Sequence, residues 1–223
     1  MNIFTENSLW LLIIQSDMMS KFVLLILLIM SVICWALFMG KLLLFYIKEK
    51  HYTLVNHTIE KAKTVQDLEA IIQVYSHTEP GYFITKTLVF LKNIGFIPLK
   101  SITAHQWELI EKNNDTLIDV TLHHDESYLS FLSSSAAVAP LLGLFGTVWG
   151  LVHAFISISE TQIADITTMA PGIAEALITT LAGLMVAIPA LIMFNYLHTK
   201  MRAIEYKLFI LSDRMMFILH QYR

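Results

Sequence analysis

The sequence has few charged residues and only one cysteine, and each of these features excludes some classes of protein or site. Only 15% of its 223 residues are Asp, Glu, Lys or Arg, whereas 56% are hydrophobic. A soluble domain is nearer one quarter charged, so this composition indicates segments buried in lipid. Because Cys34 is the one cysteine, an intrachain disulfide and a multi-cysteine metal site are excluded. The net charge of -3 gives no reason to expect a nucleic-acid partner.

The sequence contains three long apolar runs. The first, residues 22–40, contains no charged residue and no proline, and the second, residues 132–158, contains no Asp, Glu, Lys or Arg. The third, residues 171–197, contains Glu175 as its one charged residue. A bilayer core of about 30 Å needs roughly 20 apolar residues of helix, so each run can span it. Since the first 20 residues hold no Lys or Arg, we expect the first run to be a signal anchor and not a cleaved signal peptide.

The polar stretch between the first two runs has helical character. Thr64 precedes an apolar pattern at helical spacing, and Asp67 follows it three residues later, which is a capping-box signal. Pro80-Gly81 and Gly95–Pro98 mark breaks. Residues 101–132 read as one long helix that runs directly into the second apolar run, and no strand pattern is present. The sequence therefore predicts an all-α membrane protein, with three transmembrane helices and long cytoplasmic helical extensions.

The placement of Lys and Arg predicts the orientation in the membrane. Nine of these residues lie in residues 41–127 and five follow residue 198, whereas Lys21 is the only one before the first run and residues 159–170 hold none. Basic residues favour the cytoplasmic side, so the N-terminus and the short loop are expected in the periplasm and the C-terminus in the cytoplasm. The expected segments are a periplasmic N-terminal segment 1–21, transmembrane helix 22–45, cytoplasmic helical region 46–130, transmembrane helix 131–159, periplasmic loop 160–170, transmembrane helix 171–198 and cytoplasmic C-terminal helix 199–223.

Glu175 is the first candidate functional residue. A carboxylate in a transmembrane segment costs at least about 2.5 kcal/mol, so such residues usually face a bundle interior or a water path. Burial also raises the pKa of a carboxyl group, which suits a proton relay. A structural alternative remains open, because Glu175 lies about one turn inside its run and could face water near the positive end of a helix.

Small residues recur at spacings of three and four along the second and third runs, which keeps each set on one helix face. Such faces allow close helix packing in lipid, and this is the interpretation for the glycines. Thr147 and Thr180 add hydroxyl groups that either bond to their own helix or line a polar lumen. We expect Pro171 in the first helical turn and a kink at Pro189. The packing candidates are Gly143, Gly146, Gly150, Gly172, Gly183, Pro171 and Pro189.

Other polar residues give weaker signals. His153 could relay protons or pack near the outer interface, and the sequence leaves its role open. The run from His123 to Glu126 contains metal-ligand residue types, but adjacent side chains on a helix point about 100° apart, so a solvated helix surface is the better interpretation. No nucleotide-binding loop, nucleophile elbow or zinc-protease motif is present. We therefore expect no metal site, no cofactor and no enzymatic activity.

Two segments carry a family resemblance. APLLGLFGTVWGLVHAF (139–155) and APGIAEALITTLAGLMVAIPA (170–190) resemble the signature segments of the TolQ/ExbB/MotA proton-channel family over most of their length and in the same order. The stretch SVICWALF (31–38) and the three-span layout also match. The short N-terminal segment and VWG-x-x-HAF favour the TolQ branch of the family.

The resemblance implies a mechanism and partners. Five such subunits would surround a dimer of a TolR- or ExbD-like protein, whose transmembrane helix carries the aspartate that takes and releases the proton. Polar residues along the path would be Thr147, Glu175 and Thr180. Proton flow would drive motion that is passed, through the first transmembrane helix, to a TolA- or TonB-like protein. In a Tol-Pal system this work supports outer-membrane integrity and cell division.

Two questions stay open at this point. On an ideal helix Glu175 lies about 140° from Thr180 but only about 40° from Thr179, so geometry pairs Glu175 with Thr179 whereas the motif match favours Thr180. A helix irregularity near Pro171 would reconcile them, as would placement against different subunits around one lumen. The sequence also leaves the coupling ion, the subunit number, an ExbB-type role in energising TonB-dependent import, and a non-conducting membrane scaffold as alternatives.

Overall fold

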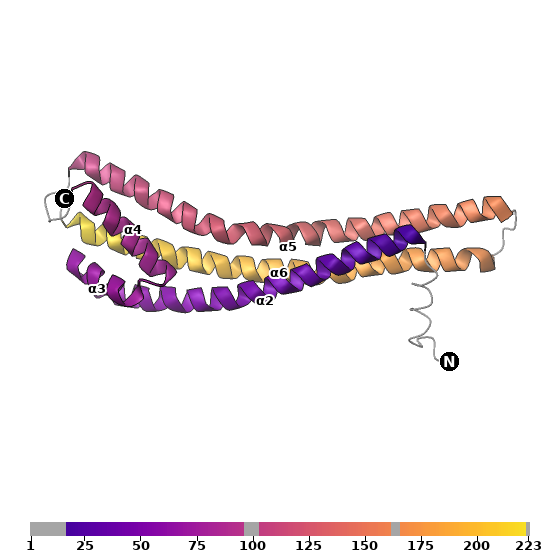
Figure 1. The fold of residues 1–223 in the computed structure, drawn as a ribbon, viewed down its shortest axis with the longest axis horizontal. Helices are drawn as coiled ribbons and strands as arrows, with labels where there is room; N and C mark the ends of the chain where they lie inside the picture. Colours follow the sequence, from indigo (N-terminus) through magenta and orange to yellow (C-terminus); the bar gives the residue numbers. More distant parts are fainter. Residues whose placement is uncertain (1–16, 96–102, 162–165, 222–223) are drawn as a thin grey trace. The chain divides into compact units, whose positions relative to one another are not determined.

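The described part of the chain is built from α-helices alone. The structure, a computed structural model, describes residues 17–95, 103–161 and 166–221. Its elements are α2 (Met18–Ile59), α3 (Val65–Tyr75), α4 (Glu79–Asn93), α5 (Ala104–Thr161) and α6 (Ile166–His220), shown in Figure 1. The all-α prediction is therefore confirmed. Most of the expected N-terminal segment 1–21 and the centre of the expected loop 160–170 lie outside the described residues.

Three of these helices are long and apolar enough to cross a membrane. The candidate spans are Met18–Ile59 in α2, Tyr128–Ile156 in α5 and Met169–His220 in α6. At 1.5 Å per residue, the 42 residues of α2 extend for about 63 Å, roughly twice the bilayer core. The 58 residues of α5 form one continuous helix, as the lack of a break signal before the second apolar run predicts.

Local sequence signals account for the ends of the shorter helices. The Thr64 hydroxyl accepts from the Asp67 amide at the start of α3, and the Asp67 carboxylate accepts from the Thr64 amide at 2.9 Å, which completes the predicted capping box. Pro80 lies in the first turn of α4, where its missing N–H costs nothing. A Cβ at Gly81 would collide with the Tyr75 carbonyl. Gly95 ends α4 with φ of 75°, a backbone conformation that favours glycine.

The start of α6 differs from the prediction. Helix α6 begins at Ile166, so Pro171 is its sixth residue and lies inside the helix with Pro189. The expectation that Pro171 occupies the first turn is wrong. No proline or glycine separates residues 166–170 from the apolar run, so the helix continues towards its N-terminus at the cost of the one backbone bond that Pro171 cannot donate.

The chain divides into two compact units, to each of which α2, α5 and α6 contribute a part. The membrane unit comprises Met1–Phe38 and Tyr128–Tyr196. Its core combines Val23 and Leu27 of α2 with Ala139 of α5 and Ala187 of α6. On the surface of the unit, many large apolar side chains are exposed, as is expected of helices that face lipid or other subunits. These include Phe22, Leu28, Val32, Leu141, Val148, Leu177, Leu181 and Met185.

The extension unit comprises Met39–Ser127 and Leu197–Arg223. Helices α3 and α4 belong to it and pack against each other. Large side chains form its core, among them the fully buried residues Phe45, Tyr52, Leu68, Phe83, Ile84, Leu91, Ile110 and Leu208. Glu49 accepts hydrogen bonds from Lys200 at 3.0 Å and Lys207 at 3.3 Å, which ties α2 to α6.

Candidate functional site

The small-residue faces of α5 and α6 pack against each other within the membrane unit. A Cβ added to Gly183 would lie 2.6 Å from the carbonyl oxygen of Ala139, and one added to Gly143 would lie 3.0 Å from the Cα of Thr180. Because backbone atoms cannot withdraw as a flexible side chain can, neither glycine leaves room for a larger residue. The interpretation of these glycines as packing residues is consistent with this geometry.

The same close approach continues along both helices. A Cβ on Gly150 would lie 3.1 Å from the Cβ of Ala176, and one on Gly172 would lie 3.0 Å from the Cβ of Ala154. Most of the small-residue face is therefore occupied inside one chain. Any polar surface that a partner helix could reach must lie at the flanks of the α5–α6 contact.

The three threonines of this region have different surroundings. Thr179 is fully buried, and its hydroxyl donates to the Ala176 carbonyl at 2.7 Å. A Cβ on Gly146 would lie 2.5 Å from that hydroxyl oxygen, so Thr179 fills the gap that this glycine leaves. Thr180 is only partly buried, and its hydroxyl donates across the interface to the Gly143 carbonyl at 3.1 Å. Thr147 is also partly exposed and donates to its own helix, to the Leu144 carbonyl at 2.7 Å.

Glu175 lies on a different side of α6 from Thr180. On a helical projection it is within about 20° of Ala182 and Val186, both of which pack against the core that includes α2. Its carboxylate accepts a hydrogen bond from the backbone amide of Asp17 at 2.9 Å. In one chain, therefore, Glu175 faces the start of α2, whereas Thr180 lies about 140° away around α6.

Sequence reasoning missed the residues that surround Glu175. Asp17 caps α2, because its carbonyl accepts from the Lys21 amide at 3.1 Å, and its carboxylate accepts from the Trp149 indole N–H at 2.9 Å. The Trp149 bond holds the pKa of the Asp17 carboxyl below its ordinary value, and the electrostatic interaction with His153 acts in the same direction. An N-cap aspartate just before an apolar run was the available signal, but nothing in the sequence indicated that it meets α5 and α6.

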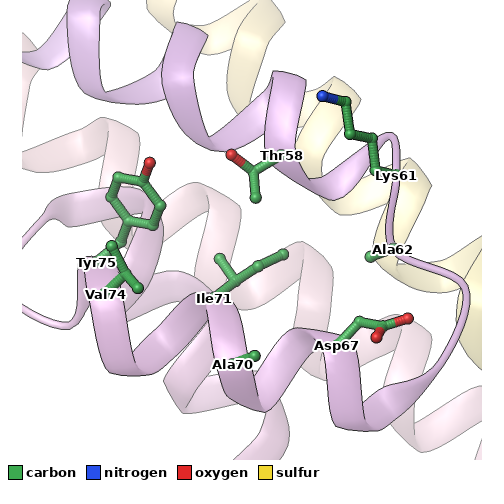
Figure 2. Close-up of a pocket in the computed structure, with 8 residues that line it drawn as sticks. All are labelled: Thr58, Lys61, Ala62, Asp67, Ala70, Ile71, Val74 and Tyr75. Carbon is green, nitrogen blue, oxygen red and sulfur yellow. The ribbon is translucent and has the colours of Figure 1, made fainter.

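A separate hollow lies in the extension unit. Figure 2 shows it between the end of α2 and α3, lined by Thr58 and Lys61 on one side and Ile71, Val74 and Tyr75 on the other. Its volume is about 350 Å³. Asp67 at its edge already accepts from the Lys63 and Thr64 amides, which lower the pKa of its carboxyl. No cluster of metal-ligating side chains occurs in the part of the chain that the structure describes.

Comparison with known proteins identifies the family. Residues 86–208 match the model of the MotA/TolQ/ExbB proton channel family, which is more than half of the chain. The chain belongs to this family. The match includes both signature segments and all of the small-residue face described above.

The relatives come from both the TolQ and the ExbB branches. The Tol-Pal system protein TolQ of Haemophilus influenzae is 29% identical over 94% of this chain and 92% of its own length. The biopolymer transport protein ExbB of Salmonella typhimurium is also 29% identical, over 86% of this chain and 78% of its own length. A TolQ of Pseudomonas aeruginosa is 41% identical over 43% of this chain and 42% of its own length. The chain is therefore a membrane protein of a proton-channel family.

Proposed function

We propose that this chain is the proton-channel subunit of an inner-membrane motor of the Tol-Pal type, which converts proton motive force into work on a TolA-like partner for outer-membrane integrity and cell division. The observation that carries the proposal is the pair of partly exposed hydroxyls, Thr147 and Thr180, beside an otherwise small and apolar α5–α6 contact. Hydroxyls at that flank can bond water or a protonated carboxyl group. Each hydroxyl donates to a carbonyl within this chain but keeps lone pairs that can accept from such a group.

The proton would be carried by a partner and not by this chain alone. Five copies would surround a dimer of a TolR- or ExbD-like protein, whose intramembrane aspartate meets Thr147 and Thr180 as it takes and releases a proton. A wall without hydroxyls would remove a hydrogen-bonding partner and raise the free-energy cost of ionising that aspartate. Since Thr179 is fully buried inside the subunit, we assign the lumen to Thr180.

Glu175 would serve the same path from the opposite edge of its subunit. It lies about 140° from Thr180 around α6 and meets the start of α2 within its own chain, so it would contribute to the path near that end of the helices and not beside the threonines. The two residues therefore need no irregularity in α6 that would bring them to one face.

The first transmembrane helix would transmit the output. An apolar groove of about 820 Å³ runs along α2 and α6 in the membrane unit, lined by Leu25, Leu28, Trp35 and Met185, with Lys21 among its lining residues. A groove of this chemistry suits an apolar transmembrane helix. We propose that the helix of the TolA-like partner docks there, with α5 and α6 facing the centre of the ring.

The TolQ assignment has a specific alternative. The match to TolQ of Haemophilus influenzae covers 92% of that protein, whereas the match to ExbB of Salmonella typhimurium covers 78%, and the identity is the same. The coverage favours a Tol-Pal role over an ExbB-type role that energises TonB-dependent import. The distribution of Lys and Arg supports an inner-membrane location with the N-terminus in the periplasm and the extension unit in the cytoplasm.

Substitution of the two hydroxyls tests the proposal. We expect Thr147→Val and Thr180→Val to abolish motor output with little loss of complex, because valine has nearly the shape of threonine but lacks its hydroxyl. Output is measured as detergent sensitivity and periplasmic leakage of cells that depend on each variant, with complex recovery measured alongside. Glu175→Gln should impair output less completely, since an amide still orders water but carries no charge.

Thr116→Val is the matched control. Thr116 lies on α5 in the extension unit and bonds to its own helix, to the Lys112 carbonyl at 2.9 Å, as Thr147 bonds to Leu144. This variant should keep normal output. Normal barrier function in Thr147→Val and Thr180→Val at wild-type complex levels would reject the lumen assignment and leave the scaffold alternative.

A further inference from the structure

The carboxylate of Glu175 is held by a chain of contacts that crosses all three long helices of the membrane unit. Trp149 on α5 donates to the Asp17 carboxylate, and the Asp17 amide at the start of α2 donates to Glu175 on α6, both at 2.9 Å. We propose that Asp17 and Trp149 are positioning residues for Glu175, with the indole N–H fixing the helix start that holds the Glu175 carboxylate. The inference rests on the proposed function, because it concerns the same proton path.

The first link of this chain follows from the geometry of a helix end. The N-terminal amides of a helix have no partner within the helix, and the partial positive charge there favours an anion. The Asp17 carbonyl accepts from the Lys21 amide, which makes Asp17 the cap of α2, and the Asp17 amide donates to Glu175. A carboxylate bonded at this point is restricted in the rotamers that it can adopt.

The second link sets where that helix start lies. Trp149 stacks on Phe145 one turn earlier on α5, with the ring centroids 6.4 Å apart, and this contact orients the indole. The indole N–H then fixes the Asp17 side chain. The carboxylate and the amide of Asp17 are joined through its Cα, so a restraint on the carboxylate limits where the amide that meets Glu175 can lie. Trp149 therefore acts on Glu175 without touching it.

Charged and titratable groups meet at this point from each helix. Asp17 lies just before α2, which carries Lys21, α6 contributes Glu175, and α5 contributes His153, whose electrostatic interaction with Asp17 lowers the pKa of the Asp17 carboxyl. Two carboxylates share the site, yet each accepts from its own N–H donor. Because each carboxylate has a separate donor, the two do not compete for one hydrogen bond.

Proton flux through the purified complex with its single-span partner, reconstituted in proteoliposomes, tests the inference. Trp149→Phe keeps the ring but removes the N–H, and Asp17→Ala removes its acceptor. We expect each to lower flux per complex about tenfold to a hundredfold, as loss of a hydrogen bond to a charged group implies. Asp17→Asn should retain at least half of the flux, roughly, because its amide oxygen still accepts from the indole. The variant that carries both Trp149→Phe and Asp17→Ala should conduct no less than whichever single variant has the lower flux, because the two residues act through one contact.

Two controls match these substitutions. Trp107→Phe and Asp115→Asn make the same chemical changes as Trp149→Phe and Asp17→Asn, but on α5 in the extension unit, and both should conduct as the wild type does. The inference is overturned if Trp149→Phe and Asp17→Ala conduct normally, if Asp17→Asn loses as much as Asp17→Ala, or if the losses multiply in the double variant and follow complex recovery.

A spectroscopic measurement separates this inference from the proposed function. In the complex labelled with ¹⁵N-tryptophan, the Trp149 indole signal, assigned by its absence in Trp149→Phe, should shift in Asp17→Ala and also in Glu175→Ala, but not in Asp115→Asn. If the wild type does not conduct but Glu175→Ala moves the signal, the proposed function fails and the positioning inference stands. If the wild type conducts and Glu175→Ala leaves the signal unmoved, the positioning inference fails alone.

Discussion

The membrane unit and the extension unit draw on the same three long helices but pack them by different means. In the membrane unit, α5 and α6 meet through glycine, alanine and threonine, and a Cβ at Gly183 would lie 2.6 Å from a backbone oxygen. In the extension unit the core is made of large side chains such as Phe45, Tyr52 and Leu208. The proposed location of the membrane unit in lipid and of the extension unit in water would account for this difference, because lipid supplies no hydrophobic driving force between helices and water does.

Polar groups also differ between the two units. In the extension unit Glu49 pairs with Lys200 and Lys207, and such pairs hold helices together. In the described part of the membrane unit, polar contacts occur near Glu175 and at the threonines. A polar group within a membrane span is costly, so those that remain there are the best candidates for function.

The largest expected effect comes from enlarging a glycine in the membrane unit. Gly183→Val places its Cβ against the Ala139 carbonyl, which cannot move without shifting α5. We expect destabilisation of about 3 kcal/mol or more and loss of most of the assembled complex. Gly40→Val is the control, since a Cβ at Gly40 meets no atom within 4 Å. Equal unfolding temperatures for the two purified variants would contradict the close-packing account.

In the extension unit, the corresponding destabilising change is truncation of a large buried side chain. Leu208→Ala removes a fully buried side chain and should lower the free energy of unfolding by about 2–5 kcal/mol. The neighbouring Phe209→Ala, at a position 47% exposed, should cost much less. Thermal unfolding of both variants checks the comparison, and a larger loss for Phe209→Ala than for Leu208→Ala would show that the core has been misplaced.

The smallest expected effect concerns the ion pairs of the extension unit. The hydrogen bond from Lys200, together with Lys207, lowers the pKa of Glu49 below its ordinary value of 4.5. The resulting stabilisation is therefore complete above that value and is lost as the pH falls through the lower pKa of the folded state. Glu49→Gln should cost about 0.5–1 kcal/mol at pH 7.

The pH dependence of that cost provides its check. The difference in unfolding free energy between wild type and Glu49→Gln should shrink as the pH is lowered below about 4.5, and high salt should reduce it at pH 7. Glu69→Gln, at an exposed position on α3, serves as the control. If the cost of Glu49→Gln grew on acidification, the ion pairs of Glu49 would not stabilise the folded state.

The sequence predicted the parts of this fold that depend on local chemistry. Long apolar runs predicted the three candidate spans, Thr64 and Asp67 predicted the start of α3, and the absence of a break signal predicted α5 as one helix. Spacings of three and four also identified the small-residue faces, although not that these faces would bury each other within one chain.

The remaining features depend on how the helices pack. Whether Thr179 or Thr180 is buried is decided by Gly143 and Gly146 on another helix, and periodicity along α6 cannot show that. The contacts of Glu175 with Asp17, and of Asp17 with Trp149, join residues more than 130 positions apart. A helical pattern indicates which residues share a face but not which helix that face meets.

Proton flux through the reconstituted complex is the most direct test of the central claim. The chain is purified with its single-span partner, placed in proteoliposomes, and compared with Thr180→Val at equal complex content while a pH gradient is applied. We predict flux in the wild type that depends on the partner's intramembrane carboxyl group and falls to background in Thr180→Val. No flux from the wild-type complex, or equal flux from Thr180→Val, would contradict the account.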